Sequence, residues 1–292
     1  MRAFDSYNPI VIFIYFLTVT VIAMFAFNPV MILITLFSEV VTTLLLRREK
    51  SGRFFGYLVL IFLITSLANP VFSHNGVTVL FVLNDNPVTL EAVLYGVSMG
   101  TLIVAVLLLM RVFSGMMTGD KILYIMGTTS PKLALLISMN LRFIPMFSRQ
   151  ATKMEQTQTA LGRYQDENAL DDIAIKMNIF SMLITWGLEN GIITADSMSA
   201  RGYGSGRRTN YSNYRFRKND AFILIGIVLI AAVTIGLIAA DKVNYSFYPH
   251  MSGIPHSAGA VICYILYGLM CLFPVVNEIG VRIKWRYLES RI

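Results

Sequence analysis

Hydrophobic residues are gathered into six long runs along the chain, and segments rich in polar residues separate them. A helix that crosses the hydrocarbon core of a bilayer needs about 20 apolar residues, within a range of about 17–25. The third run is the shortest and therefore predicts the weakest span. The pattern predicts six membrane-spanning helices, over residues 10–27, 29–46, 54–67 with an extension toward 72, 92–110, 221–240 and 258–276.

The composition points to the same class of protein. Hydrophobic residues make up 55% of the 292 residues and charged residues only 14%, whereas soluble domains are about a quarter charged. These values exclude a disordered chain, a disulfide scaffold and an ordinary soluble enzyme. The net charge of +7 does not require a nucleic acid partner, because basic residues also collect on the cytoplasmic loops of membrane proteins. The predicted fold class is all-α, a polytopic helical membrane protein.

The distribution of lysine and arginine predicts the orientation in the membrane. Four of them lie in residues 47–53, fourteen in 111–220 and four after residue 276. The 68–91 segment carries none and the 241–257 segment carries one. With six spans, every basic segment falls on one side, as the positive-inside rule requires. Both termini are therefore predicted to be cytoplasmic in a multi-pass protein of the cell membrane.

This topology divides the chain into three parts. Residues 1–110 hold the N-terminal transmembrane helices, and residues 68–91 within them form an outer loop. Residues 111–220 form a cytoplasmic or membrane-surface region of coupling helices. Residues 221–292 hold the C-terminal transmembrane helices and a basic cytoplasmic tail.

The outer loop contains a short β pattern. Val77-Thr78-Val79 opens a run of β-branched and apolar residues that ends at the turn formers Asn84-Asp85-Asn86-Pro87, and Val88-Thr89-Leu90 follows. Such residues on both sides of a turn predict an extended hairpin. The alternative is an irregular loop that rests on the membrane surface.

The 111–220 segment predicts two long helices. Ser130-Pro131 is a helix start, with a capping serine and a first-turn proline, and the helix stops at Gly162. The second helix begins near Asp171-Asp172, whose carboxylates suit the positive end of the helix dipole. The first half of each helix is apolar and the later half is polar, so both helices are expected to end on the water side.

The end of the second helix carries the most informative motif, Ala200-Arg201-Gly202 followed by Tyr203 and Gly204. Alanine is small, glycine takes the left-handed conformation that ends a helix, and the arginine fork can bind a carboxylate with two hydrogen bonds. This blunt end therefore fits a groove on a partner protein. The alternative is an ordinary helix cap with a solvated arginine.

This stretch resembles the second of two Ala-Arg-Gly-type motifs in the T component of energy-coupling factor (ECF) transporters. The sequence Ala160-Leu161-Gly162-Arg163 is similar to the first motif. Further similarity lies in residues 72–74, 88–92 and 141–145. The resemblance extends over residues 69–211. In place of the first motif's arginine the chain has Leu161, and Arg163 follows two residues later, so either residue is a candidate for the first contact.

The resemblance implies a coupling role and a set of partners. A T component is a membrane subunit without enzymatic activity of its own, and each of its two motifs docks on one ATP-binding cassette ATPase subunit. It passes the movement of the two ATPases to a separate substrate-binding membrane subunit, the S component. That subunit would bind the vitamin or the transition-metal ion, such as cobalt or nickel. The resemblance implies no cofactor for this chain.

Two other classes compete with this interpretation. An integral-membrane enzyme, such as a lipid-modifying transferase or an intramembrane hydrolase, needs paired carboxylates, a metal cluster or a nucleophile with its base. Glu39 is the one clear carboxylate inside a predicted span, and the three histidines lack zinc spacing. A secondary transporter would show inverted repeats. The chain also lacks the GxxxxGK[ST] pattern, so ATP hydrolysis through a P-loop belongs to partners.

The predicted topology can be tested by labelling cysteines from outside intact cells. A membrane-impermeant maleimide should modify a cysteine introduced at Asn84 and spare one introduced at Gln165. Labelling at Gln165 without labelling at Asn84 would reverse the orientation.

Overall fold

The structure, a computed structural model, describes residues 4, 7–46, 52–73, 76–83, 86–162, 169–203, 206 and 214–289. The chain forms two compact units, residues 1–118 with 214–292, and residues 119–213. Within the described ranges the units are helical apart from one two-stranded sheet. The predicted all-α class is therefore confirmed.

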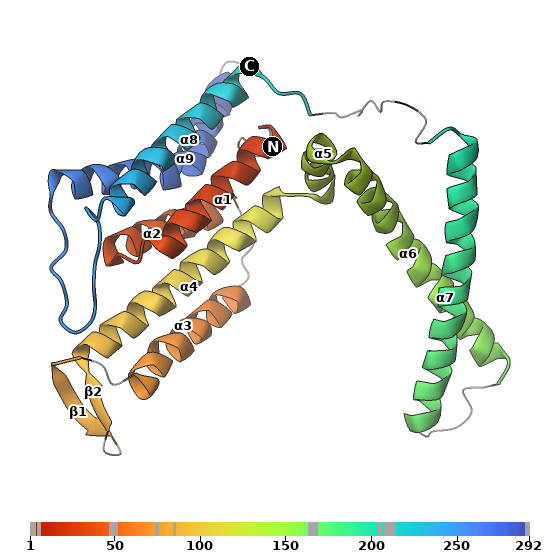
Figure 1. The fold of residues 1–292 in the computed structure, drawn as a ribbon, viewed down its shortest axis with the longest axis horizontal. Coiled ribbons are helices and arrows are strands. Elements are labelled where there is room, and N and C mark those ends of the chain that lie inside the picture. Colours follow the sequence, from red (N-terminus) through yellow and green to blue (C-terminus); the bar gives the residue numbers. More distant parts are fainter. Residues whose placement is uncertain are drawn as a thin grey trace. The chain divides into compact units, whose positions relative to one another are not determined.

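The described residues of the first unit form six helices, one for each predicted apolar run (Figure 1). Four of them are long and apolar enough to cross a membrane. The prediction that the third span would be the weakest is wrong, because its helix includes Pro70 in its last turn and reaches 21 residues, against 17 and 18 for the first two. The helices are α1 (Pro9–Phe25), α2 (Pro29–Leu46), α3 (Gly52–Phe72), α4 (Leu90–Met116), α8 (Lys218–Ala239) and α9 (Ala258–Glu289).

The core of this unit surrounds α1, which packs against α4 and α8. Ile12, Tyr15 and Phe16 on α1 are almost completely buried. The ring of Tyr15 lies edge-to-face against Phe16 at 5.2 Å and against Phe4 at 5.5 Å. Aromatic pairs of this geometry add to the stabilisation from burial alone.

Hydrogen bonds join α1 and α2 to α9 inside the unit. The Ser38 hydroxyl donates to the Cys271 carbonyl oxygen at 2.6 Å, and the Tyr15 hydroxyl donates to the same oxygen at 3.2 Å. The hydroxyls of Thr35 and Tyr267 lie 2.8 Å apart. These polar groups satisfy one another across helices, as they must where no water reaches them.

Glu39 on α2 faces the same interior, as expected for a carboxylate within a span. The residue is 2% exposed. Its Oε2 atom is buried and has no hydrogen-bond partner among the described residues, and the same holds for the hydroxyl of Thr43 one turn later. The buried polar groups between α2 and α9 therefore extend to two further oxygens, those of Glu39 and Thr43, on one face of α2.

Two glycines bring α3 and α4 into close contact. A Cβ atom built at Gly96 would lie 2.5 Å from the backbone oxygen of Ser66, and one at Gly100 would lie 3.0 Å from the Thr65 hydroxyl. The spacing Gly-x-x-x-Gly places both glycines on one face of α4, where they allow the two backbones to approach. This motif was not identified in the sequence analysis, although the pattern is visible in the sequence.

A β-hairpin connects these two helices. Strand β1 (Val79–Leu83) pairs antiparallel with β2 (Asn86–Thr89). Thr89 caps α4 by accepting a hydrogen bond from the Ala92 backbone, and the Glu91 carboxylate accepts hydrogen bonds from the backbone and hydroxyl of Thr78. The predicted hairpin is confirmed, but its turn is shorter than predicted, because Asn86 and Pro87 already pair with β1; residues 84–85 lie outside the described residues.

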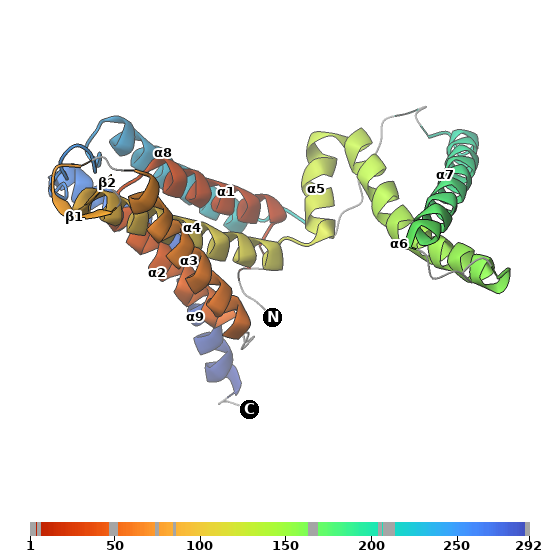
Figure 2. The same cartoon turned by 90° about the horizontal axis from the view of Figure 1, so that it is seen from below.

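The second unit contains α5 (Gly119–Thr129), α6 (Pro131–Ala160) and α7 (Ala169–Ala200). Helix α6 begins at the predicted serine–proline pair, and both long helices end where predicted. Helix α5 was not predicted, because it has only 11 residues and includes a glycine and two threonines near its end. Helices α6 and α7 cross each other in both views (Figures 1 and 2).

The α3–α4 contact leads to a stability prediction. Gly96→Ala should lower the thermal midpoint of the detergent-purified protein by about 2–10 °C, because overpacking of this kind costs about 1–3 kcal/mol. The matched control is Gly226→Ala on α8, where an added Cβ atom meets nothing within 4 Å. Equal melting of the two variants would show that close approach at Gly96 does not stabilise the protein.

Candidate functional site

The candidate site lies in the second unit, at the two helix ends that the sequence singled out. Helices α6 and α7 cross, and each continues beyond the crossing to its C-terminal end (Figures 1 and 2). At the crossing the ring of Phe147 on α6 meets the ring of Trp186 on α7 edge-on, with centroids 5.6 Å apart. The two ends are therefore the tips of two crossed helices.

Helix α7 ends in a Schellman motif. The Gly202 backbone N–H donates to the Ser199 carbonyl at 3.0 Å, and the Tyr203 N–H donates to the Met198 carbonyl at 3.1 Å. Gly202 has φ = +73°, a left-handed conformation that glycine adopts without the penalty of a Cβ atom. The backbone turns sharply here, and Arg201 is the last residue before the turn.

Helix α6 also ends at a glycine with a left-handed φ. The Gly162 N–H donates to the Thr159 carbonyl at 3.0 Å, and Gly162 has φ = +76°. Leu161 is the C-cap residue. It therefore holds, at the end of α6, the position that Arg201 holds at the end of α7. One end presents an apolar side chain and the other presents a cation.

The side chains at both ends are open to a partner. Leu161 is 69% exposed and Tyr203 is 50% exposed. Ala160, Ala200 and Arg201 are also exposed. The two remaining residues of the predicted site, Arg163 and Gly204, lie outside the described part of the chain.

Charge at the second end suits the helix that carries it. The last carbonyl groups of an α-helix bear a partial negative charge, and a cation beside them is stabilised. Arg201 is exposed at this position. Its guanidinium group can bind a carboxylate on another protein and remain favourably placed on its own helix.

Both long helices also expose apolar side chains before the crossing. Helix α6 has no buried residue among its 30 residues. On α7, Met177 and Phe180 are each more than half exposed, while Ile179 is buried. A surface of this kind needs lipid or another protein to cover it.

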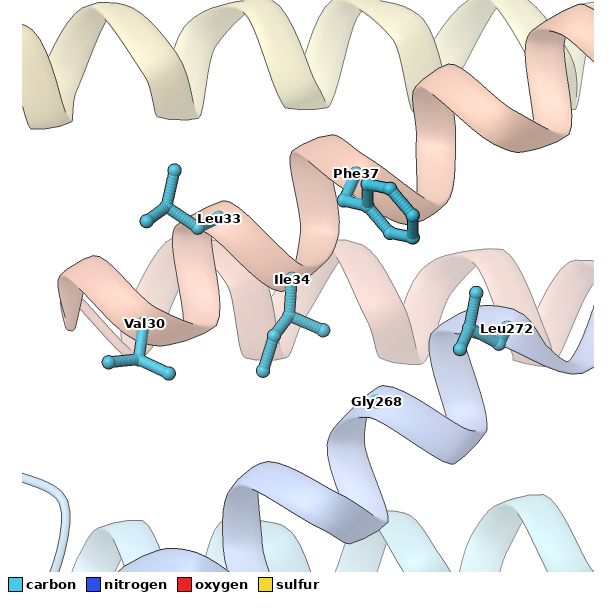
Figure 3. Close-up of a pocket in the computed structure, with 6 residues that line it drawn as sticks. All are labelled: Val30, Leu33, Ile34, Phe37, Gly268 and Leu272. Atoms are coloured by element: carbon cyan, nitrogen blue, oxygen red, sulfur yellow. The ribbon is translucent and has the colours of Figure 1, made fainter. Parts of the chain in front are cut away.

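The described residues offer little for catalysis. They contain no group of three or more His, Cys, Asp or Glu side chains that could hold a metal ion. A groove of about 380 Å³ lies in the first unit between α2 and α9 (Figure 3), and its lining is apolar: Val30, Leu33, Ile34, Phe37, Gly268 and Leu272. None of these lining residues is titratable, so the groove supplies no acid, base or nucleophile.

The two helices end the same number of residues beyond their crossing, which the sequence patterns alone did not reveal. Phe147 and Gly187 meet at the crossing. Phe147 and Gly187 are separated by the same number of residues as Leu161 and Arg201. The number of residues from the contact to the helix end is therefore the same on both helices. The repeated Ala-x-Gly triplet was a visible signal of this relation, but the crossing contact was not.

Comparison with known proteins agrees with this architecture. The sequence profile of the CbiQ family, described as cobalt transport protein, matches residues 6–211. No curated protein matches the chain at a significant level. The family match spans more than half of the chain and includes both helix ends, and it agrees with the resemblance to ECF T components. The family match and the four long apolar helices indicate a transport protein of the membrane. The chain belongs to the CbiQ cobalt transport protein family.

Proposed function

We propose that the chain is the transmembrane coupling subunit of an ECF-type ABC importer. The observation that carries the proposal is the pair of equally built, exposed, glycine-capped helix ends on two crossed helices. Membership of a cobalt transport family supports it. The chain transmits movement and leaves ATP hydrolysis and substrate binding to its partners.

Each helix end docks on one ABC ATPase subunit in this proposal. Ala160, Leu161, Gly162 and Arg163 form the first contact. The second contact consists of Ala200, Arg201, Gly202, Tyr203 and Gly204. Small residues beside each cap allow a partner groove to close around the helix end, and Arg201 pairs with a carboxylate in that groove.

The difference between Leu161 and Arg201 gives the two contacts different chemistry. An apolar cap residue gains by leaving water for an apolar pocket, whereas an arginine requires a desolvated but oppositely charged partner. Two non-identical ATPase subunits, or two different regions of one kind of subunit, would satisfy this pair of ends.

The separate substrate-binding membrane subunit covers apolar surface of α6 and α7. Their apolar side chains before the crossing, which this chain leaves exposed, support such a partner together with the lipid bilayer. The family description favours cobalt or a related transition-metal ion as the substrate, and a vitamin is the alternative. The S component, which binds that substrate, then determines which solute is transported.

The proposed topology has six membrane passes, cytoplasmic termini and cytoplasmic helix ends. The three parts of the chain are residues 1–110, 111–220 and 221–292. When the ATPases close on ATP, they drive the two docked ends together. Helices α6 and α7 carry this motion as rigid bodies to the substrate subunit, which requires an element with two discrete positions.

The first functional prediction concerns Arg201. Removing one member of a buried charge pair costs about 2–5 kcal/mol of binding, a loss of about 30-fold or more, and reversing the charge adds repulsion. Arg201→Glu should therefore abolish ATP-dependent substrate uptake while the protein still accumulates in the membrane. Uptake and membrane abundance are measured in the same cells.

Two control variants accompany Arg201→Glu. Arg149→Glu reverses an exposed arginine on α6 away from its end, and Arg207→Ala with Arg208→Ala removes two cations that follow the cap in sequence. Both controls should retain most uptake, because exposed ion pairs contribute only about 0–1 kcal/mol. Wild-type uptake by Arg201→Glu at equal abundance would reduce Arg201 to a solvated helix cap.

The second functional prediction concerns the apolar end. Leu161→Asp should strongly weaken ATPase docking, because a carboxylate buried in an apolar contact costs several kcal/mol. Leu161→Ala should weaken docking only modestly. The amount of ATPase that co-purifies with each variant measures the effect. If Arg163→Ala abolished assembly while Leu161→Asp had no effect, Arg163 would be the contact residue instead.

A further inference from the structure

We propose that the contact between Phe147 and Gly187 is the fulcrum of the two coupling helices, with both residues acting as positioning residues. The contact sets the angle at which α6 and α7 cross, and so the separation of the two helix ends. This inference rests on the proposed coupling function and adds to it a specific place about which the helices move.

The contact is too close to admit a Cβ atom at position 187 unless the Phe147 ring or one of the helices moves. A Cβ atom at position 187 would lie 2.6 Å from Cζ and 2.7 Å from Cε1 of Phe147. The Phe147 ring therefore lies directly on the α7 backbone. Since real Cβ atoms do not approach other heavy atoms this closely, a side chain here would force the two helices apart or displace the ring.

Neighbouring aromatic rings hold Phe147 in this position. Trp186 lies edge-on to the Phe147 ring with an interplanar angle of 89°, and Phe143, one turn earlier on α6, lies edge-on to the same ring with centroids 6.3 Å apart. The side-chain amide of Asn190 donates to the Trp186 carbonyl at 2.9 Å. A ring restrained by two others can serve as a stiff point of contact.

The contact gives the two helices arms of equal length. The step in sequence from Phe147 to Ala160, the last residue of α6, equals the step from Gly187 to Ala200, the last residue of α7. At about 1.5 Å per residue, each arm is about 20 Å long. A change of about 10° in the direction of either arm would then displace its tip by about 3–4 Å. Equal arms turn a small change at the crossing into equal displacements at the two ATPase contacts.

Uptake by the full chain, co-expressed with its ATPase and substrate subunits, tests the fulcrum. Gly187→Ala should lower ATP-dependent uptake about tenfold or more while the ATPases still co-purify, since the helix ends are unaltered. Gly191→Ala is the matched control. It makes the same substitution one turn later on the same helix, where an added Cβ atom meets nothing within 4 Å. It should transport like the parent protein.

A compensating variant separates a fulcrum from a general loss of folding. Leucine at position 147 lacks the Cζ and Cε atoms that an alanine at 187 would meet. Gly187→Ala combined with Phe147→Leu should therefore recover much of the uptake that Gly187→Ala loses. Recovery supports the fulcrum, whereas additive losses in the double variant would contradict it.

A distance measurement reports the geometry itself. Spin labels at the exposed positions Thr159 and Ser199, in full-length protein with Cys263→Ala and Cys271→Ala, measure the separation of the two ends in lipid nanodiscs. Gly187→Ala should shift or broaden the distance distribution, and Gly191→Ala should leave it unchanged. The double variant should return the distribution toward that of the parent.

The outcomes separate this inference from the function on which it rests. If the parent protein fails to co-purify with ATPase subunits, the proposed function fails before any variant is compared, and the fulcrum's role in coupling fails with it. If the parent assembles and transports but Gly187→Ala matches Gly191→Ala in uptake or in label distance, the coupling function stands and the fulcrum is wrong.

Discussion

Helices surrounded by lipid gain little by burying apolar side chains against one another, because the lipid tails are equally apolar. Contact between them must therefore come from close approach and from hydrogen bonds that have no water to replace them. The helices of the first unit follow that constraint, and the second unit has a helix contact of similar closeness. In the first unit, Gly96 and Gly100 bring α4 against the α3 backbone. In the second unit, Gly187 brings α7 against the ring of Phe147. An added Cβ atom would lie 2.5 Å from a backbone oxygen at Gly96 and 2.6 Å from the Phe147 ring at Gly187, so the neighbouring groups would have to move.

The hydrogen bonds that join α1 and α2 to α9 satisfy the same constraint through polar side chains. Two hydroxyls, from Tyr15 and Ser38, donate to one carbonyl oxygen at Cys271. Beyond them Glu39 and Thr43 place buried oxygens on the same helix without partners in the described part of the chain. The first unit is thus stabilised by close backbone approach between α3 and α4 and by hydrogen bonds among the buried polar groups of α1, α2 and α9. The second unit leaves most of the surface of α6 and α7 exposed, as the docking role proposed for these helices requires.

The two helix ends share a backbone geometry but differ in side-chain chemistry. Gly162 and Gly202 adopt nearly the same left-handed φ, +76° and +73°. The residue before each glycine is apolar in one case and cationic in the other. The backbone therefore has the same conformation at both glycines, and in the proposed coupling function the side chains would distinguish the two partner surfaces. Both helices end the same number of residues beyond the Phe147–Gly187 contact, so a pivot at that contact would move the two ends equally.

Local patterns predicted much of this protein. Apolar run length predicted the six helices described in the first unit, Ser130-Pro131 predicted the start of α6, and Gly162 and Gly202 predicted where the long helices end, since each feature depends on residues adjacent in sequence. Helix α5 was not predicted, because 11 residues give too short a hydrophobic pattern to indicate a helix. The strength of α3 was misjudged because its apolar run was counted from residue 54 to 67, whereas the helix extends from Gly52 through Pro70 to Phe72. Only the tertiary structure decided which glycines matter: Gly187 and Gly191 are equivalent by sequence, and the first touches Phe147 while the second meets nothing. The direction in which α6 crosses α7 made that choice, and it depends on contacts between residues on two different helices, far apart in the sequence, which no local pattern determines.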